Sequence, residues 1–131
     1  MTVAFNKAFT YVLLAVHGVL ALWALVGFIE WFATATPWPR LSNPHFPPAI
    51  LFLQWTLTLA AACVFIGGYV RRWARTPGAM ACVYGAMAAL CAVETFVYME
   101  SETRYVAMLL EYLAYAGILV FLFRSRLFQP G

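Results

Sequence analysis

Two glutamates stand inside long apolar segments of this sequence, and their carboxyls are the side chains best suited to chemistry. Glu94 lies six residues before Glu100, and Glu111 lies seven residues after Arg104. At a helical rise of about 1.5 Å per residue, both carboxyls would lie about 9–10 Å inside the same end of two helices. Two carboxyls at one level in hydrocarbon can share a proton, and a protonated carboxyl can donate that proton to a ligand. We therefore predict a catalytic pair, Glu94 and Glu111.

Other polar and aromatic side chains could complete a ligand-binding site around this pair. Gln54 follows the double proline that opens the second apolar segment, which places it about 9 Å deep, level with the carboxyls. Tyr98 and Tyr115 each follow one of the two glutamates by four residues, so each phenol would share a helical face with an acid. The predicted ligand-binding residues are Gln54, Glu30, Tyr98, Tyr115, Trp55 and His17.

A structural use of the same polar groups is the alternative. A glutamate within two turns of a membrane surface can be hydrated there or can extend toward the headgroups. Glu30 stands beside Trp31, a residue type that is typical of the interface. Gln54 could simply join two helices through hydrogen bonds. Both interpretations remain open on the sequence alone.

The sequence predicts neither a metal ion nor a cofactor. His17 lies deep in the first apolar segment, whereas the second histidine, His45, falls in a proline-rich loop and could not be a second haem ligand. No acid inside the apolar segments has the histidine three residues later that di-metal carboxylate bundles use. Cys63, Cys82 and Cys91 lack the paired spacing of a metal or redox motif.

Four long apolar segments must position these side chains. The 131 residues are 65% hydrophobic and only 10% charged, which excludes a water-soluble domain. Each segment has about 20 apolar residues, enough to cross the hydrocarbon core of a bilayer. We predict an all-α integral membrane protein, an up-down four-transmembrane-helix bundle that forms a single domain over residues 1–131. The predicted helices cover residues 9–33, 48–72, 77–99 and 104–123.

The basic residues predict the orientation of this bundle. Six of the eight lie at the end that holds both termini and the loop between the second and third helices. The positive-inside rule therefore predicts a multi-pass protein with cytoplasmic N- and C-termini. The arginines at 71, 72 and 75 serve as this topology signal, and anionic lipid headgroups are an alternative ligand for them. Nothing resembles a nucleic-acid-binding surface. The six residues are Lys7, Arg71, Arg72, Arg75, Arg124 and Arg126.

One short motif occupies the turn between the second and third predicted helices and reads Trp73, Ala74, Arg75, Thr76, Pro77. Further landmarks are an early histidine, a double proline and a basic residue followed by serine after the fourth helix: His17, Pro47, Pro48, Arg124 and Ser125. The motif and the order of these landmarks resemble the EXPERA family of membrane proteins.

The resemblance implies a four-helix core with acidic residues inside the bundle and a role in lipid handling, as in the sterol isomerases and lipid-binding proteins of the family. This sequence departs from the family at Leu25 and Gln54, where the family carries acids. Glu94 and Glu111 would then have to supply the carboxyls from the third and fourth helices.

Two functions follow as expectations. The first is binding of an apolar lipid, isoprenoid or sterol-like molecule in an outer-leaflet cavity, and it leaves open whether the protein also catalyses isomerase-like proton transfer. The second is a non-enzymatic accessory or assembly subunit of a larger membrane complex, or a homodimer. A stripe of small residues favours such helix contacts, since it lets another helix approach closely. The stripe consists of Ala81, Gly85 and Ala89.

Overall fold

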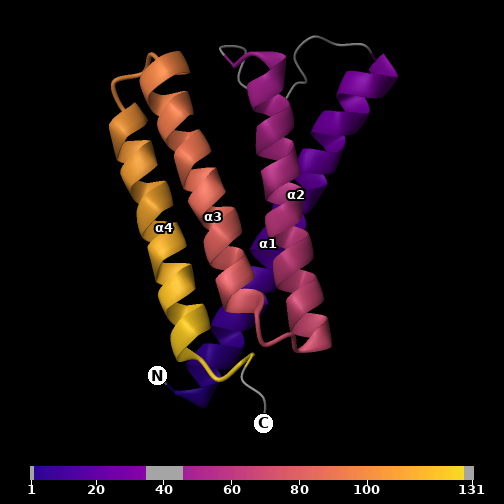
Figure 1. Cartoon of the computed structure of the whole chain (residues 1–131), viewed down its shortest axis with the longest axis vertical. Coiled ribbons are helices and arrows are strands. Elements are labelled where there is room, and N and C mark those ends of the chain that lie inside the picture. The colour runs from indigo at the N-terminus through magenta and orange to yellow at the C-terminus, as the bar shows by residue number, and fades with distance from the viewer. Residues whose placement is uncertain (1, 35–45, 129–131) are drawn as a thin grey trace.

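The computed structural model describes residues 2–34 and 46–128, and four helices account for nearly all of them. Each helix is long and apolar enough to cross a membrane, which makes this a multi-pass membrane protein. Both termini and the α2–α3 turn lie at one end of the molecule, so the helices run alternately up and down (Figure 1). The structure confirms the predicted all-α four-helix bundle. The elements are α1 (Val3–Thr34), α2 (Pro48–Arg71), α3 (Thr76–Val93), the π-helix η1 (Glu94–Tyr98) and α4 (Arg104–Arg124).

Two helix boundaries differ from the prediction. The first helix begins at Val3 rather than at residue 9, because the polar residues Asn6 and Lys7 are compatible with a helix that extends beyond the hydrocarbon. The third helix changes after Val93 into η1, where the backbone N–H of Met99 donates to the carbonyl of Glu94 at 2.8 Å. This is the wider i to i+5 turn that occurs mostly as a single turn at the end of, or inside, α-helices.

The bundle is tightly packed at the end that holds the termini. One buried cluster there joins all four helices, and it includes Leu13, Phe65, Met80, Tyr84, Phe121 and Leu122. The rings of Phe9 and Phe121 meet edge to face with centroids 4.6 Å apart, which ties the start of α1 to the end of α4. The helices are therefore held together most firmly in this half.

The opposite half is organised differently. A second buried cluster joins mainly α1 and α2 around Trp55, and it receives no residue from α4. Toward this end α3 and α4 diverge from α1 and α2 (Figure 1). The buried residues of α4 are Phe121 and Leu122, which lie near its C-terminal end, in the packed half of the bundle. Polar groups of the diverging half can therefore face a space between the helices.

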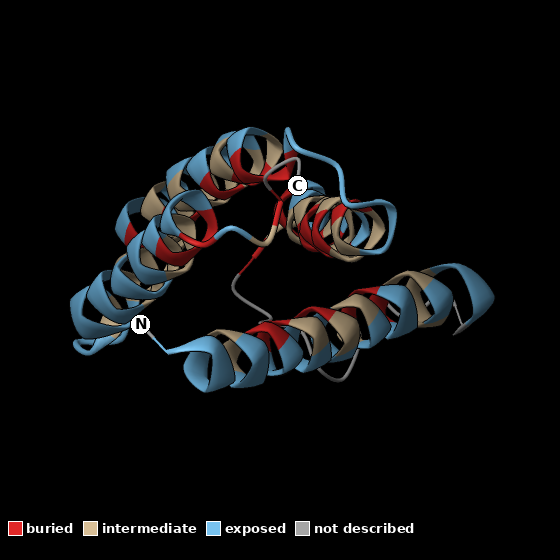
Figure 2. Ribbon diagram, turned by 90° about the horizontal axis from the view of Figure 1, so that it is seen from below, coloured by how far each residue is buried: buried red, intermediate tan, exposed pale blue. Residues whose placement is uncertain are grey.

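The outer surface of the bundle is apolar, as a lipid-facing surface requires. Seen from the end that holds the termini, the buried positions lie on the inner sides of the helices and the exposed ones outside (Figure 2). The small-residue stripe is not used within the chain, since Gly85 and Ala89 are exposed and a Cβ atom at Gly85 would meet nothing within 4 Å.

Candidate functional site

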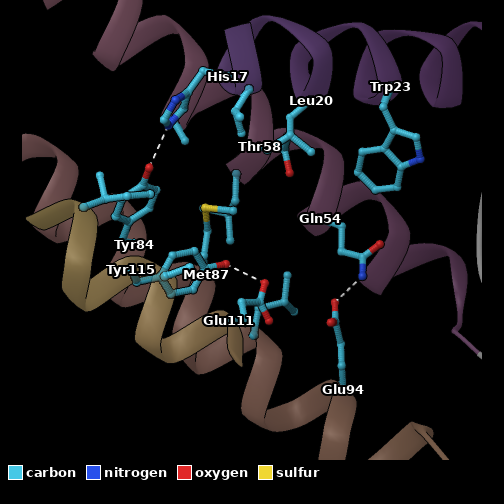
Figure 3. A pocket seen from close by; sticks show the side chains of 16 residues that line it. His17, Leu20, Trp23, Gln54, Thr58, Tyr84, Met87, Glu94, Glu111 and Tyr115 are labelled. Carbon is cyan, nitrogen blue, oxygen red and sulfur yellow. Dashed lines mark hydrogen bonds between the residues drawn. The ribbon is translucent and has the colours of Figure 1, made fainter. Parts of the chain in front are cut away.

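A cavity of about 340 Å³ lies between the four helices, and its polar groups gather at two places (Figure 3). All four helices and η1 contribute to its walls. Its volume falls within the range of small-molecule binding sites. Most of the lining is aliphatic or aromatic, including Leu57, Met87, Leu90 and Ile118. This cavity contains both predicted catalytic carboxyls, Glu94 and Glu111.

The first polar group is formed by the two predicted carboxyls and their partners. Gln54 Nε2 donates a hydrogen bond to Glu94 Oε1 at 2.6 Å. The Tyr115 hydroxyl donates to Glu111 Oε1 at 2.6 Å. Both glutamates are half-buried, line the same cavity and lie within electrostatic range of each other. The structure thus brings together four residues that come from α2, η1 and α4.

No cation offsets these two carboxyls. Within residues 2–34 and 46–128, no lysine or arginine lines the cavity. A carboxylate inside the membrane costs at least about 2.5 kcal/mol by insertion scales, and two neighbouring carboxylates add their mutual repulsion. Hydrogen bonds from Gln54 and Tyr115 supply one donor to each glutamate. A shared proton or a donor group on a ligand would complete the compensation.

The second polar group is centred on His17, which is almost fully buried. Its Nδ1 lies 2.7 Å from the carbonyl of Leu13, and its Nε2 lies 2.6 Å from the Tyr84 hydroxyl. A carbonyl can only accept, so Nδ1 donates to Leu13, while Nε2 and the Tyr84 hydroxyl share the second hydrogen bond. The imidazole also stacks on Phe65, with centroids 4.7 Å apart. Both ring nitrogens of His17 therefore have a hydrogen-bond partner within the bundle.

The aromatic rings connect the two polar groups. Tyr84 and Tyr115 stack with centroids 4.8 Å apart, and their hydroxyls bond to His17 and to Glu111 respectively. Figure 3 shows these rings side by side along one wall of the cavity. The sequence analysis missed Tyr84. Tyr84 lies eight residues after the start of α3, and His17 lies eight residues after the predicted start of the first helix. The two side chains are therefore at similar depths, and this match could have identified them as hydrogen-bond partners.

Three predicted ligand-binding residues do not line the cavity. Tyr98 lies edge-on to Phe46 and does not pair with Glu94, because η1 replaces the α-helical spacing that would place residues four apart on one face. Trp55 is buried between α1 and α2, where its ring covers Gly27. Glu30 lies outside the cavity wall. The structure therefore does not bring these three predicted residues to the cavity wall.

Comparison with known proteins adds no family to this description. No protein-family model, curated protein or solved structure matches the chain. The geometry of the cavity is therefore the basis on which a function has to be proposed.

Proposed function

We propose that this protein binds an apolar lipid, isoprenoid or sterol-like molecule in the cavity between its helices. One observation carries the proposal: a mostly apolar cavity inside a membrane bundle holds two carboxyls, and none of the described residues that line it is a lysine or an arginine. Such a site favours a ligand with an apolar body and a hydroxyl or amine head. The head would lie at Glu94 and Glu111, and the body would lie against Leu57, Met87 and Leu90.

Proton transfer to the bound molecule is the chemistry that this proposal allows. A carboxyl pair that holds one proton can donate it to a double bond or a hydroxyl and take another back. The resemblance to the EXPERA family supports an isomerase-like reaction of this kind. The remaining residues would orient the head, since Gln54 and Tyr115 each hold one carboxyl in place.

The proposal is tested by what the protein carries when it is purified in a mild detergent. We expect native mass spectrometry to show a bound small molecule that organic solvent releases. Ala114→Phe should remove at least nine tenths of it, because Ala114 lines the cavity and a phenyl ring there would fill the space. The matched variant Leu113→Phe, on the exposed side of α4, should retain it. A wild-type protein free of any such molecule would contradict the proposal.

A second candidate function is that of an accessory subunit in a larger membrane complex. The outward-facing stripe of Gly85 and Ala89 favours it, because small residues in membrane helices let a partner helix approach closely. The same purification separates the two candidates. A stoichiometric partner protein, lost in Gly85→Leu, together with an empty cavity would favour the accessory role.

We further propose that both termini and the α2–α3 turn are cytoplasmic, because six basic residues lie at that end. Single cysteines at Ser101 and Ala74, in a background without native cysteines, test this orientation, since both positions are exposed at opposite ends. In intact cells an impermeant thiol reagent should label position 101 and should label position 74 only after permeabilisation. The reverse pattern would invert the assignment.

A further inference from the structure

A second cavity, of about 710 Å³, lies against the α2–α3 turn, far from the carboxyl pair. Its upper wall, along α2, is apolar, and its lower wall, at the α2–α3 turn, carries two arginines. Cys63, Val64 and Gly67 line the part along α2, and Arg71, Arg72 and Trp73 line the part at the turn. Positions 63, 67 and 71 are four apart and therefore share one helical face. The cavity follows this face for about 12 Å, from the guanidinium level into the membrane-spanning part of α2.

Gly67 lies on the wall of this cavity. A Cβ atom at this position would meet nothing within 4 Å. The missing side chain therefore leaves space on the helix face between the arginines and Cys63. An acyl chain or a glycerol backbone could lie in such a groove.

Arg71 and Arg72 have no carboxylate partner among the residues that the structure describes. All five acidic side chains of the protein are at positions 30, 94, 100, 102 and 111, none of them in or beside this turn. In the part of the chain that the structure describes, no ion pair engages Arg71 or Arg72. Trp73 is 46% exposed beside them, as is typical of a residue at the level of lipid headgroups.

The turn holds these side chains in a fixed backbone conformation. Arg72 is left-handed, with φ 50° and ψ 44°, and the N–H of Trp73 donates to the carbonyl of Gly68 at 2.9 Å. Thr76 Oγ1 donates to the carbonyl of Trp73 at 2.6 Å and occupies the space that a Cβ atom at Gly68 would need. Glycine or asparagine would suit position 72 better than arginine. The backbone therefore gives no reason for a guanidinium at this position.

We infer that this groove binds an anionic phospholipid, with the phosphate between the guanidiniums of Arg71 and Arg72 and an acyl chain along Gly67 and Cys63. Guanidinium groups recognise phosphate through charge-assisted, often bidentate hydrogen bonds. The apolar upper wall distinguishes a lipid from free phosphate, which would use only the lower wall. If the arginines served only to set the membrane orientation, their charges would be sufficient and no groove beside them would be required.

The test titrates the purified full-length protein in detergent with dioleoylphosphatidylglycerol and follows the lipid adduct by native mass spectrometry. Arg72→Gly removes one guanidinium, and glycine adopts the left-handed conformation of this position without strain. We expect this variant to bind the lipid about fivefold more weakly. The added change Arg71→Gln should bring the loss to about 25-fold. Gly67→Leu should weaken binding at least tenfold, since it adds a bulky side chain at a position that lines the groove and has open space for a Cβ atom.

Matched controls separate this site from general charge and from the first cavity. Arg124→Gln removes a cation at the same end outside the groove and should change binding less than twofold, and Ala114→Phe should also leave it unchanged. Dioleoylphosphatidylcholine should bind at least tenfold more weakly, and millimolar sodium phosphate should not displace the lipid. Equal losses in Arg124→Gln and Arg72→Gly, full binding in Gly67→Leu, or displacement by phosphate would overturn the inference. Far-ultraviolet circular dichroism verifies that each variant is folded.

Discussion

Replacement of Gly27 by alanine should destabilise the packing of α1 on α2 by about 1–3 kcal/mol, the usual cost of an extra carbon in a filled core. A Cβ atom at this position would overlap the indole ring of Trp55 at Cε2. The Trp55 ring cannot move aside easily, because only 1% of it is exposed and Phe28 and Phe52 pack against it. Detergent-induced unfolding, followed by circular dichroism and tryptophan fluorescence, measures the effect.

Gly18→Ala on the same helix is the matched control. A Cβ atom at Gly18 would meet nothing within 4 Å, and alanine is the better helix former by about 1 kcal/mol. We therefore expect the Gly18 variant to be as stable as the wild type or slightly more stable. If Gly27→Ala were equally harmless, the close packing of Trp55 on α1 would be incorrect. Because Trp55 adjoins Gln54, the Gly27 variant should also retain less of the bound small molecule.

The second large effect is expected at the carboxyl pair. Glu94→Gln and Glu111→Gln should each weaken binding of a long-chain amine, such as dodecylamine, by about tenfold or more. A hydrogen bond to a charged partner contributes about 1.5–3 kcal/mol, and glutamine keeps the shape of the side chain while removing its charge. Isothermal titration in detergent measures the affinity. The double variant should lose less than the sum of the two single losses, since the two groups act on one ligand head.

The α3–α4 loop supplies the controls for this experiment. Glu100 and Glu102 are exposed carboxyls close in sequence to the cavity but outside it, so their glutamine variants should bind dodecylamine normally. Infrared difference spectra provide a readout that does not depend on a ligand. A protonated-carboxyl band that disappears in Glu94→Gln or Glu111→Gln would show the shared proton directly. Equal weakening in all four glutamine variants would mean that the amine responds to surface charge and not to this site.

Counting residues along the sequence was sufficient to place the polar groups by depth. Hydropathy and proline positions defined four spans, and a constant helical rise then brought Gln54, Glu94 and Glu111 to one level. The direction of each side chain was harder to predict. Membrane helices are apolar around their whole circumference, so hydropathy does not show that Trp55 faces α1 and not the cavity.

Tyr98 shows a different limit of sequence reasoning. The rule that residues i and i+4 share one face holds for an α-helix. The residue types from Glu94 onward do not predict the wider turn of η1. The partner of His17 was predictable in principle, because a polar ring deep in a membrane requires one. Tyr84 is the tyrosine of α3 at a depth similar to that of His17, and its hydroxyl shares a hydrogen bond with the imidazole.

The packed end of the bundle has a consequence for how a ligand reaches the first cavity. Below His17 and Tyr84 the interior is filled by Phe65, Met80 and Leu122, each at most 1% exposed. Among the described residues, these side chains close the interior between the cavity and the end that holds the termini. We therefore expect a molecule in the cavity to exchange mainly with the opposite monolayer, so that the occupancy of the cavity follows the lipid composition of that half of the bilayer. A lipid confined to the other half would first have to cross the membrane by a separate flipping step.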